Sequence, residues 1–316
     1  MRYPAILPEI GFLRPRRTGE QEMDYQKTSG LQSLSRSLVS VGSPLIAIAV
    51  YGLAGLGAVI AIDLTTFAVA FVTLLLFVKL PSVPTSQGDE RTTVESAREG
   101  FAFLRGNPLI RDVLLFMSGV NLVASAFDAT LPAYVIPNPR GGNGVLGVVT
   151  ACSGAAMLAG SVLAMGLPKP ENRVRVIYLT MLFSLGIENF MLAFSRSPIV
   201  WCVAQVIGWI LVPVMGASYD VVMRGTVPVE LQGRVYACRN TLQYFTIPLG
   251  LLLGGFLVDE AFEPFMAQYG SNELLTLLFG SGKGSGAALV MFVLGVTGTL
   301  FCVAFGRRLN RYRFQK

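Results

Sequence analysis

The chain has 316 residues, of which 53% are hydrophobic and only 14% charged, and its formal net charge is +6. Soluble domains have about 25% charged residues, so this composition indicates a membrane protein. The absence of histidine excludes Ser-His-Asp catalysis, H-E-x-x-H zinc sites and haem ligation by histidine, and the four cysteines form no C-x-x-C pair. We therefore expect no enzyme activity, no metal site and no cofactor.

Separated apolar runs follow one another along the chain, each of roughly 20 residues, the length needed to cross a hydrocarbon core of about 30 Å. Backbone polar groups in lipid must be satisfied internally, so each run predicts a transmembrane helix. The first run starts near Leu38, too late for a secretory signal peptide. Eight spans are predicted, at about 36–55, 57–79, 109–134, 144–166, 174–195, 198–223, 236–257 and 286–306.

The basic residues predict the orientation of these spans, because cytoplasmic loops carry the excess of Lys and Arg. With both termini in the cytoplasm, all 25 basic residues except Arg140, Arg196 and Lys283 fall in or beside cytoplasmic segments. The expected location is the cell (inner or plasma) membrane. Because the positive charge follows the loops and forms no single patch, nucleic-acid binding is not expected.

The glycine-rich stretch "GSGKGSG", Gly280–Gly286, superficially resembles a phosphate-binding loop. A P-loop requires Ser or Thr after its lysine, whereas Lys283 is followed by Gly284. The predicted topology also puts Lys283 in an external loop. That loop is expected to hold Asp259, Glu260, Glu263 and Glu273 as well. No nucleotide is therefore expected, and the stretch is interpreted as a flexible lead-in to the last span.

Residues 80–108 form a long cytoplasmic connection, with two predicted spans before it and six after it. It opens with the polar run "PSVPTSQGDE". Val94, Ala97, Phe101 and Leu104 then recur at helical spacing, which predicts an amphipathic helix on the inner membrane surface.

Several phrases of the sequence resemble the macrolide-exporter-like branch of the major facilitator superfamily. They are "SGLQSLSRSLVSVGSPLIA", "IDLTTFAVAFVTLL", "AREGFAFLRGNPLIRDVLLF", "VPVELQGRVYACRNTLQYFTIPLG" and "DEAFEPFMA". They occur in the family's order from about Leu31 onward. The resemblance implies an all-α polytopic membrane protein with a complete C-terminal six-helix half at 109–316. Residues 80–108 would be the linker, and 1–79 would hold only the last two helices of the N-terminal half.

The same resemblance implies a function and raises a question about it. Family members have twelve spans, so we expect an N-terminally truncated chain. The implied function is secondary active efflux of amphipathic small molecules, such as macrolides or other drugs, in exchange for protons. The alternative is a non-transporting remnant, or a membrane assembly partner whose missing helices come from another chain. Lipid and a small molecule are the expected partners.

Carboxyl groups within the spans are candidates for proton coupling, because charges in the bilayer interior are costly. Glu188 ranks first, since it lies about fourteen residues, or roughly 21 Å, into its span. Asp128 ranks second and shares a helix face with Ser118, Asn121 and Ser125. For both residues, a satisfied structural pair is the alternative.

Asp63, Asp220 and Arg234 are assigned gating or structural ion-pair roles. Asp63 lies in the first turns of its span, where capping or interhelical bonding suffices. Asp220 lies near the cytoplasmic end, within reach of Arg224 and of either Arg234 or Arg239.

Polar residues of the third and seventh predicted spans are candidates for lining a substrate cavity. They are Asn121, Ser125, Arg239, Gln243 and Thr246. Hydrogen bonding between helices is the competing interpretation. Pro213 and Pro248 predict kinks within their spans, as does Pro44. Gly250 and Gly254 predict close helix packing.

Overall fold

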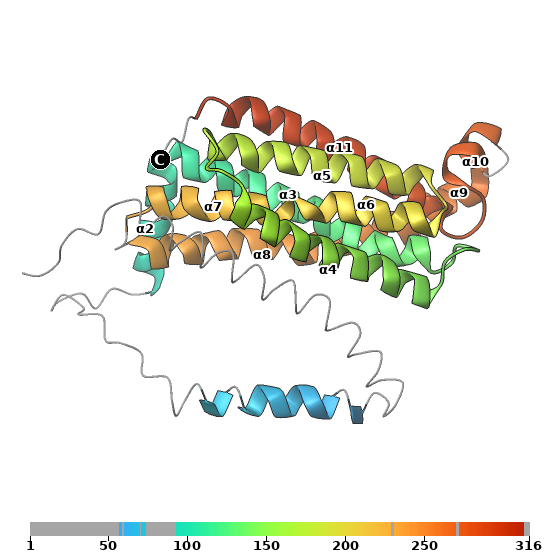
Figure 1. The fold of residues 1–316 in the computed structure, drawn as a ribbon, viewed down its shortest axis with the longest axis horizontal. Coiled ribbons are helices and arrows are strands. Elements are labelled where there is room, and N and C mark those ends of the chain that lie inside the picture. Colours follow the sequence, from blue (N-terminus) through green and yellow to red (C-terminus); the bar gives the residue numbers. More distant parts are fainter. Residues whose placement is uncertain are drawn as a thin grey trace, which may run out of the picture.

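The computed structural model of the chain describes residues 57–58, 60–69, 71–73, 93–228, 231–269 and 272–312. Over these residues the fold is entirely helical, without any β-strand (Figure 1). The predicted all-α class is therefore confirmed. The predicted span 36–55 and Pro44 lie outside the described residues, so the count of eight spans and the division into two partial halves remain predictions.

Six helical segments are long and apolar enough to cross a membrane. Each corresponds to one of the six predicted spans after residue 108. They are α3 (Pro108–Val135), α4 (Asn143–Gly166), α5 (Arg173–Phe194), α6 with α7 (Pro198–Ile210 and Val212–Thr226), α8 (Gln232–Phe256) and α11 (Ser285–Leu309).

The two proline positions in the described spans behave differently. The fourth of these spans is interrupted at Leu211, and Pro213 follows in the first turn of α7. Proline is tolerated there because backbone N–H groups in the first turn have no acceptor within the helix. Pro248 lies inside α8, which runs without interruption from Gln232 to Phe256. The helix is thus interrupted just before Pro213, whereas α8 continues through Pro248, and kinks at the two prolines remain predictions.

Residues 60–69 and 71–73, in the predicted second span, are also helical. Figure 1 shows this segment, in blue, apart from the main bundle. Its large apolar side chains are exposed, including Ile60, Leu64 and Phe67. Apolar side chains on every face are typical of a helix surrounded by lipid or by other helices.

The main bundle is held together by α3, α5 and α11, and each of the other spans packs on one or more of them. Helix α3 packs on α8 and α11, and α5 packs on α11, α6 and α7, while α4 covers α6 and α7. Small residues allow the closest contacts. A Cβ added at Gly250 or Gly254 of α8 would lie 2.4 or 2.3 Å from a backbone oxygen of α3. The predicted close packing at these two glycines is confirmed.

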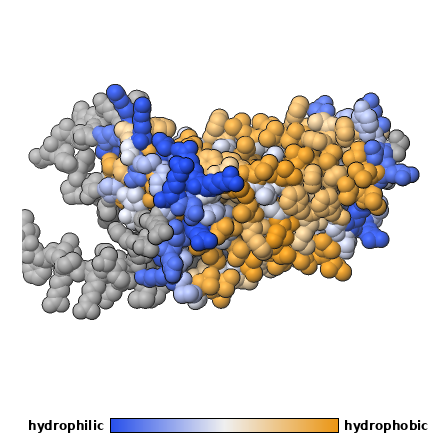
Figure 2. All heavy atoms as spheres, turned by 90° about the horizontal axis from the view of Figure 1, so that it is seen from above, coloured by the Kyte–Doolittle hydropathy of each residue, from blue (hydrophilic) through white to orange (hydrophobic). Residues whose placement is uncertain are grey.

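The surface of the bundle has a hydrophobic band between two hydrophilic ends (Figure 2). Exposed side chains of Val162, Ile199, Leu252 and Leu300 contribute to this apolar surface. A belt of this kind is expected for helices whose outer faces contact lipid. Together with the six long apolar helices, it supports a multi-pass membrane protein.

Helix α2 (Thr93–Gly106) lies at one end of the bundle, where it packs on α8 and α3. It is the helix predicted within the 80–108 connection. Leu104 is buried, but Phe101, on the predicted apolar face, is exposed. Gly100 allows the contact with α8, because a Cβ there would lie 2.7 Å from Cys238 Sγ.

The opposite end is more helical than the predicted external loop. The segment after α8 continues as a π-helix (Leu257–Phe262), α9 (Glu263–Tyr269) and α10 (Glu273–Phe279). Asn272 caps α10 by accepting the N–H groups of Leu274 and Leu275, and acidic residues suit the first turns of helices. The connection between the last two predicted spans thus contains short helices, and its external location remains a prediction.

The glycine-rich stretch leads into α11, as predicted. Gly280, Gly282 and Gly284 all have positive φ angles, which suit residues without a Cβ. Glu263 Oε1 accepts the N–H groups of Gly284 and Ala287 at 2.8 and 3.3 Å. The start of α11 is therefore capped by a carboxylate from another helix.

Candidate functional site

A pocket of about 250 Å³ lies among α3, α4, α7 and α8. Met117, Met157 and Met215 contribute flexible apolar side chains to its lining. The polar part of the lining comes from α3, α7 and α8, and consists of Asn121, Tyr219, Asp220, Arg239, Gln243 and Tyr244. Three of these six, Asn121, Arg239 and Gln243, were selected from the sequence as cavity candidates, and Asp220 as an ion-pair candidate.

Gln243 is the centre of the polar contacts in this pocket. Its Nε2 donates to the Tyr219 hydroxyl at 2.8 Å, and its backbone oxygen accepts from Asn121 Nδ2 at 3.4 Å. The same oxygen accepts from the Thr246 hydroxyl at 2.7 Å. Gln243 is buried, so these bonds satisfy groups that would otherwise be desolvated without partners. They join α3, α7 and α8 at one level of the bundle.

Arg239 gives the pocket a cationic side chain. Its guanidinium carbon lies 5.0 Å from the ring centre of Tyr236 and 5.7 Å from that of Tyr219. Its Nε and Nη2 also donate to Asn240 Oδ1, at 3.1 and 3.0 Å. Contacts with aromatic faces stabilise a guanidinium in a partly desolvated position. With Asp220 in the same lining, the pocket contains both an acidic and a basic group.

Two of the sequence-selected cavity residues do not line this pocket. Ser125 is buried where α3 meets α8, and its Cβ would lie 2.8 Å from a Cβ added at Gly250. Thr246 is bonded to the oxygen of Gln243, as described above. Ser125 thus takes part in the contact between α3 and α8, whereas the Thr246 hydroxyl bonds within α8.

Glu188 lies deep in the bundle, on α5. Glu188 is only 4% exposed. At a rise of 1.5 Å per residue, it lies about 22 Å along the helix axis from Arg173, the first residue of α5. The carboxylate packs against α6 at Gly208, where an added Cβ would lie 2.0 Å from Oε2. One turn earlier, the Ser184 hydroxyl donates to the backbone oxygen of Gly208. A glycine at position 208 therefore makes room for the Glu188 carboxylate.

Several polar atoms where α5 faces α6 lack partners. Glu188 Oε1, Gln205 Nε2 and Trp209 Nε1 are buried without a hydrogen-bond partner among the described residues. Asp128 of α3 and Trp209 of α6 lie near the Glu188 carboxyl group. Asp128 itself is exposed on α3. Buried polar groups are normally satisfied, so an acceptor and two donors without partners form an unusual cluster.

Arg234 and Asp63 complete the predicted set. Arg234 forms an ion pair with Glu99 of α2 and is 31% exposed, so it ties α8 to α2. Asp63 is exposed in the helical segment at residues 60–69. The backbone oxygen of Asp63 accepts the Thr66 hydroxyl at 2.9 Å.

The sequence analysis missed a buried carboxylate near the start of α3. Asp112 is 0% exposed, and Arg308 of α11 donates to its two oxygens at 2.6 and 2.8 Å. The Tyr312 hydroxyl donates to Asp112 at 3.0 Å, and Arg111 Nε does so at 3.2 Å. Partial burial, the bond to Asp112 and the negative charge of Asp112 raise the pKa of Tyr312 above its usual value. The signal in the sequence was an acidic residue near the start of one span and a basic pair at the end of the last.

Among the described residues, no group of three or more His, Cys, Asp or Glu side chains could hold a metal ion. The four cysteines are free thiols.

Efflux proteins are among the known proteins similar to this chain. The multidrug efflux pump Tap of Mycolicibacterium fortuitum is 28% identical over 167 residues, which cover 52% of this chain and 39% of that protein. Macrolide efflux protein A of Streptococcus pyogenes is 22% identical over 256 residues, covering 80% and 62%. The Enterococcus faecalis protein of that name is 22% identical over 247 residues, covering 77% and 75%. The chain spans less than two thirds of the first two relatives. No family model and no solved structure matches it.

Proposed function

Because the chain is a relative of the multidrug and macrolide efflux proteins of the major facilitator type, we propose that it forms part of a secondary transporter that exports amphipathic small molecules. The observation that carries this proposal is the pocket among α3, α4, α7 and α8. Polar residues from three helices meet there with a set of methionines. Such a mixture suits ligands that have both a polar group and an apolar body.

The lining favours a broad range of substrates over a single one. Methionine side chains are flexible and polarizable, so Met117, Met157 and Met215 can adapt to ligands of different shape. The volume of about 250 Å³ is slightly below the range of roughly 300–1,000 Å³ that is typical of ligand pockets. We infer that these helices provide one wall of a larger cavity. The facing wall would come from helices outside the described residues or from another polypeptide.

Glu188 is the group we propose to exchange protons with the aqueous phases. Its Oε1 has no partner among the described residues, and ionised groups without partners are costly in a buried site. The protonated form is better tolerated there, so opening the site to water on one side would favour release of the proton. Asp128, which lies near the same carboxyl group, would be the second member of this pair.

We propose that the end of the bundle with α2 and the last turn of α11 faces the cytoplasm. Arg105, Arg111, Arg175, Arg224 and Arg308 all belong to this end. Lys and Arg concentrate on the cytoplasmic side of membrane proteins, which supports this orientation.

Efflux of a fluorescent dye tests the proposal. The 316-residue chain and a version extended by four family-type spans would be expressed in cells, with and without a protonophore. We expect protonophore-sensitive efflux by at least one version. Changing Gln243 and Arg239 together to alanine should abolish this efflux. If neither version moves dye although both reach the membrane, the export function is wrong. Efflux by the extended version alone would mean that this chain depends on further helices.

A further inference from the structure

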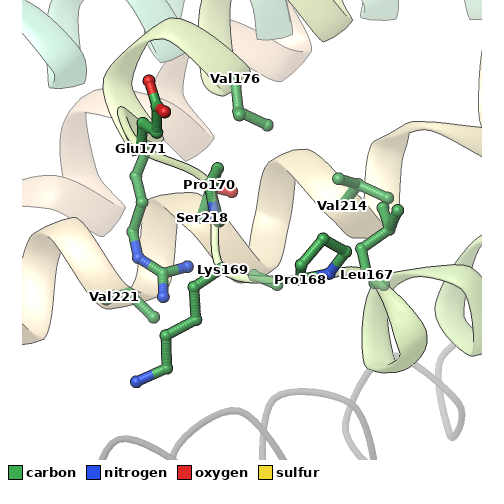
Figure 3. Close-up of a pocket in the computed structure, with 12 residues that line it drawn as sticks. Leu167, Pro168, Lys169, Pro170, Glu171, Val176, Val214, Ser218 and Val221 are labelled. Carbon is green, nitrogen blue, oxygen red and sulfur yellow. The ribbon is translucent and has the colours of Figure 1, made fainter. Parts of the chain in front are cut away.

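Two surface features lie outside the candidate transport pocket. At the end of the bundle with the basic residues, a second pocket of about 410 Å³ is formed by α4, α5, α7 and the connection from α4 to α5 (Figure 3). Its lining includes Lys169, Glu171 and Arg173, and both basic residues have interactions within the chain, so their charges assign no ligand to this pocket. At the opposite end of the bundle, the short helix α10 has an exposed apolar face, and this face indicates a partner.

One side of α10 is fixed to the bundle. Phe279, the last residue of this helix, is buried, and its ring centre lies 5.8 Å from that of Phe194 on α5 and 5.6 Å from that of Phe292 on α11. Arg196, in the connection from α5 to α6, donates from Nη2 to the backbone oxygen of Thr276 at 2.9 Å. The position of α10 is therefore set by contacts with two spans and with the connection that follows one of them.

Another side of α10 is apolar and uncovered. Leu274, Leu277 and Leu278 are 65%, 78% and 38% exposed. Residues three and four positions apart lie on the same face of a helix, so the three leucines form one surface. A short helix that packs on a protein in water needs a single apolar face, whereas α10 has this second one. A contiguous exposed apolar surface of this kind marks a place of contact with another molecule or with a membrane.

The apolar surface of the spans reaches α10. Phe194, the last residue of α5, is 48% exposed and contacts the buried ring of Phe279. Ile199, in the first turn of α6, is also exposed. These side chains belong to helices that are apolar enough to cross a membrane, and α10 packs directly beside one of them. The leucine face thus lies where the lipid-facing surface ends.

The preceding helix α9 has the residue types of a membrane boundary. Phe265 and Tyr269 are both exposed, and their ring centres lie 4.9 Å apart. Tyrosine is enriched where the hydrocarbon core meets the headgroups, because its ring is apolar and its hydroxyl is polar. Helix α9 packs on α11, as α10 does, so both short helices are held at this end of the bundle.

We propose that α10 lies on the membrane surface, with Leu274, Leu277 and Leu278 inserted between the headgroups and the acyl chains. With seven residues, this helix is roughly 10 Å long, too short to cross a bilayer and suited to the plane of the interface. Its one charged residue, Glu273, is acidic, so the contact depends on apolar area and does not require acidic lipids. A second copy of the chain is the competing occupant of this face.

Fluorescence of an introduced tryptophan tests the proposal. The full chain with Leu277→Trp would be reconstituted in phosphatidylcholine vesicles, with or without bromine atoms on the acyl chains near the headgroups. Emission of the wild-type chain, from Trp201 and Trp209, is subtracted. We expect the remaining emission to fall about twofold in the brominated vesicles, because an interfacial helix inserts its apolar face about 5–10 Å into this region. Iodide in the aqueous phase should quench it only weakly.

Lys283→Trp is the matched control. Lys283 is exposed in the connection from α10 to α11, at the same end of the bundle, but its charged side chain belongs in water. Its replacement should show the opposite pattern, with strong quenching by iodide and weak quenching by the brominated lipid. The pair of variants thus separates a specific insertion of the leucine face from general proximity to the bilayer.

Three results would overturn the proposal. Strong quenching of Leu277→Trp by iodide would place the leucine face in water. Equal quenching of both variants by the brominated lipid would show no specific insertion of α10. Protection of Leu277→Trp from both quenchers would assign the face to a second copy of the chain. Leu274→Trp, on the same face, serves as the reporter if Leu277→Trp does not fold.

Discussion

The protein buries two carboxylates in different ways. Asp112, near the start of α3, receives hydrogen bonds from Arg308, Tyr312 and Arg111. Glu188, deep in α5, has an oxygen without any partner among the described residues. Both side chains are almost completely removed from solvent, so burial alone does not separate them.

The difference lies in what each carboxylate does for the bundle. A buried carboxylate with several charge-assisted hydrogen bonds stabilises the contact between two helices, and here it holds the beginning of α3 to the end of α11. A buried carboxylate with an unsatisfied oxygen costs stability, and it is the one that we propose to gain and lose a proton. Changing each of them to its amide is therefore the most direct test.

Asp112→Asn should have the largest effect on stability. The variant loses the negatively charged acceptor of the hydrogen bonds from Arg308 Nε and Nη2. Hydrogen bonds to charged groups contribute about 1.5–3 kcal/mol. Because Arg308 is 46% exposed, water can solvate its released charge, and we expect a loss at the lower end of this range. Titration with SDS in mixed micelles, followed by tryptophan fluorescence, measures it. Unchanged unfolding would show that the cluster is not an anchor.

Glu188→Gln should have the opposite profile. The amide cannot exchange protons, so proton-driven efflux by a transport-competent form should fall at least about tenfold, as when a group that acts in proton transfer is removed. Stability should change by less than about 1 kcal/mol, since Glu188 forms no ion pair with the residues that the structure describes. The comparison with Asp112→Asn in the same unfolding assay is the control. A large loss of stability with normal coupling would place Glu188 among the structural groups.

Gly208→Ala tests whether the position of the Glu188 carboxylate matters. The added Cβ would lie 2.0 Å from Oε2, so the carboxylate must move. The end of a glutamate side chain is flexible, and we expect only a small loss of stability but a several-fold change in efflux at fixed proton gradient. The control is Gly255→Ala on α8, since Gly255 lines neither pocket and an added Cβ there meets nothing within 4 Å. Equal effects of the two variants would remove Gly208 from the mechanism.

The sequence predicted the six spans after residue 108 and the depth of Glu188 because both depend on local counting. Hydropathy over 20 residues marks a helix in lipid, and the rise per residue gives the depth of a side chain. It did not predict the partner of Asp112, since Arg308 is 196 positions away and several basic residues at the same end of the bundle were equally suitable. Likewise, Arg234 bonds Glu99 of α2, a helix whose docking site depends on tertiary packing.

The candidate pocket was predictable in part for the same reason. Helical spacing placed Arg239 and Gln243 on one face of α8, and the polar stripe on α3 included Asn121. The spacing could not show that Tyr219 receives the Gln243 amide, because that contact depends on how α7 is set beside α8 after the interruption at Leu211. Contacts between residues of two different helices can be identified only in the packed structure.

Tyr312→Phe should give the smallest effect and sharpens the description of the Asp112 cluster. Loss of one hydrogen bond should cost about 0.5–1.5 kcal/mol at neutral pH. The pKa of Tyr312 is raised on folding, so its protonated form is favoured in the folded state. This contribution is fully present below the unfolded value near pH 10 and is lost as the pH rises through the folded pKa. SDS titrations at pH 8 and above pH 10 should therefore show the stability difference between wild type and Tyr312→Phe shrinking at high pH. A difference that is constant or grows with pH would mean that the hydroxyl does not donate to Asp112.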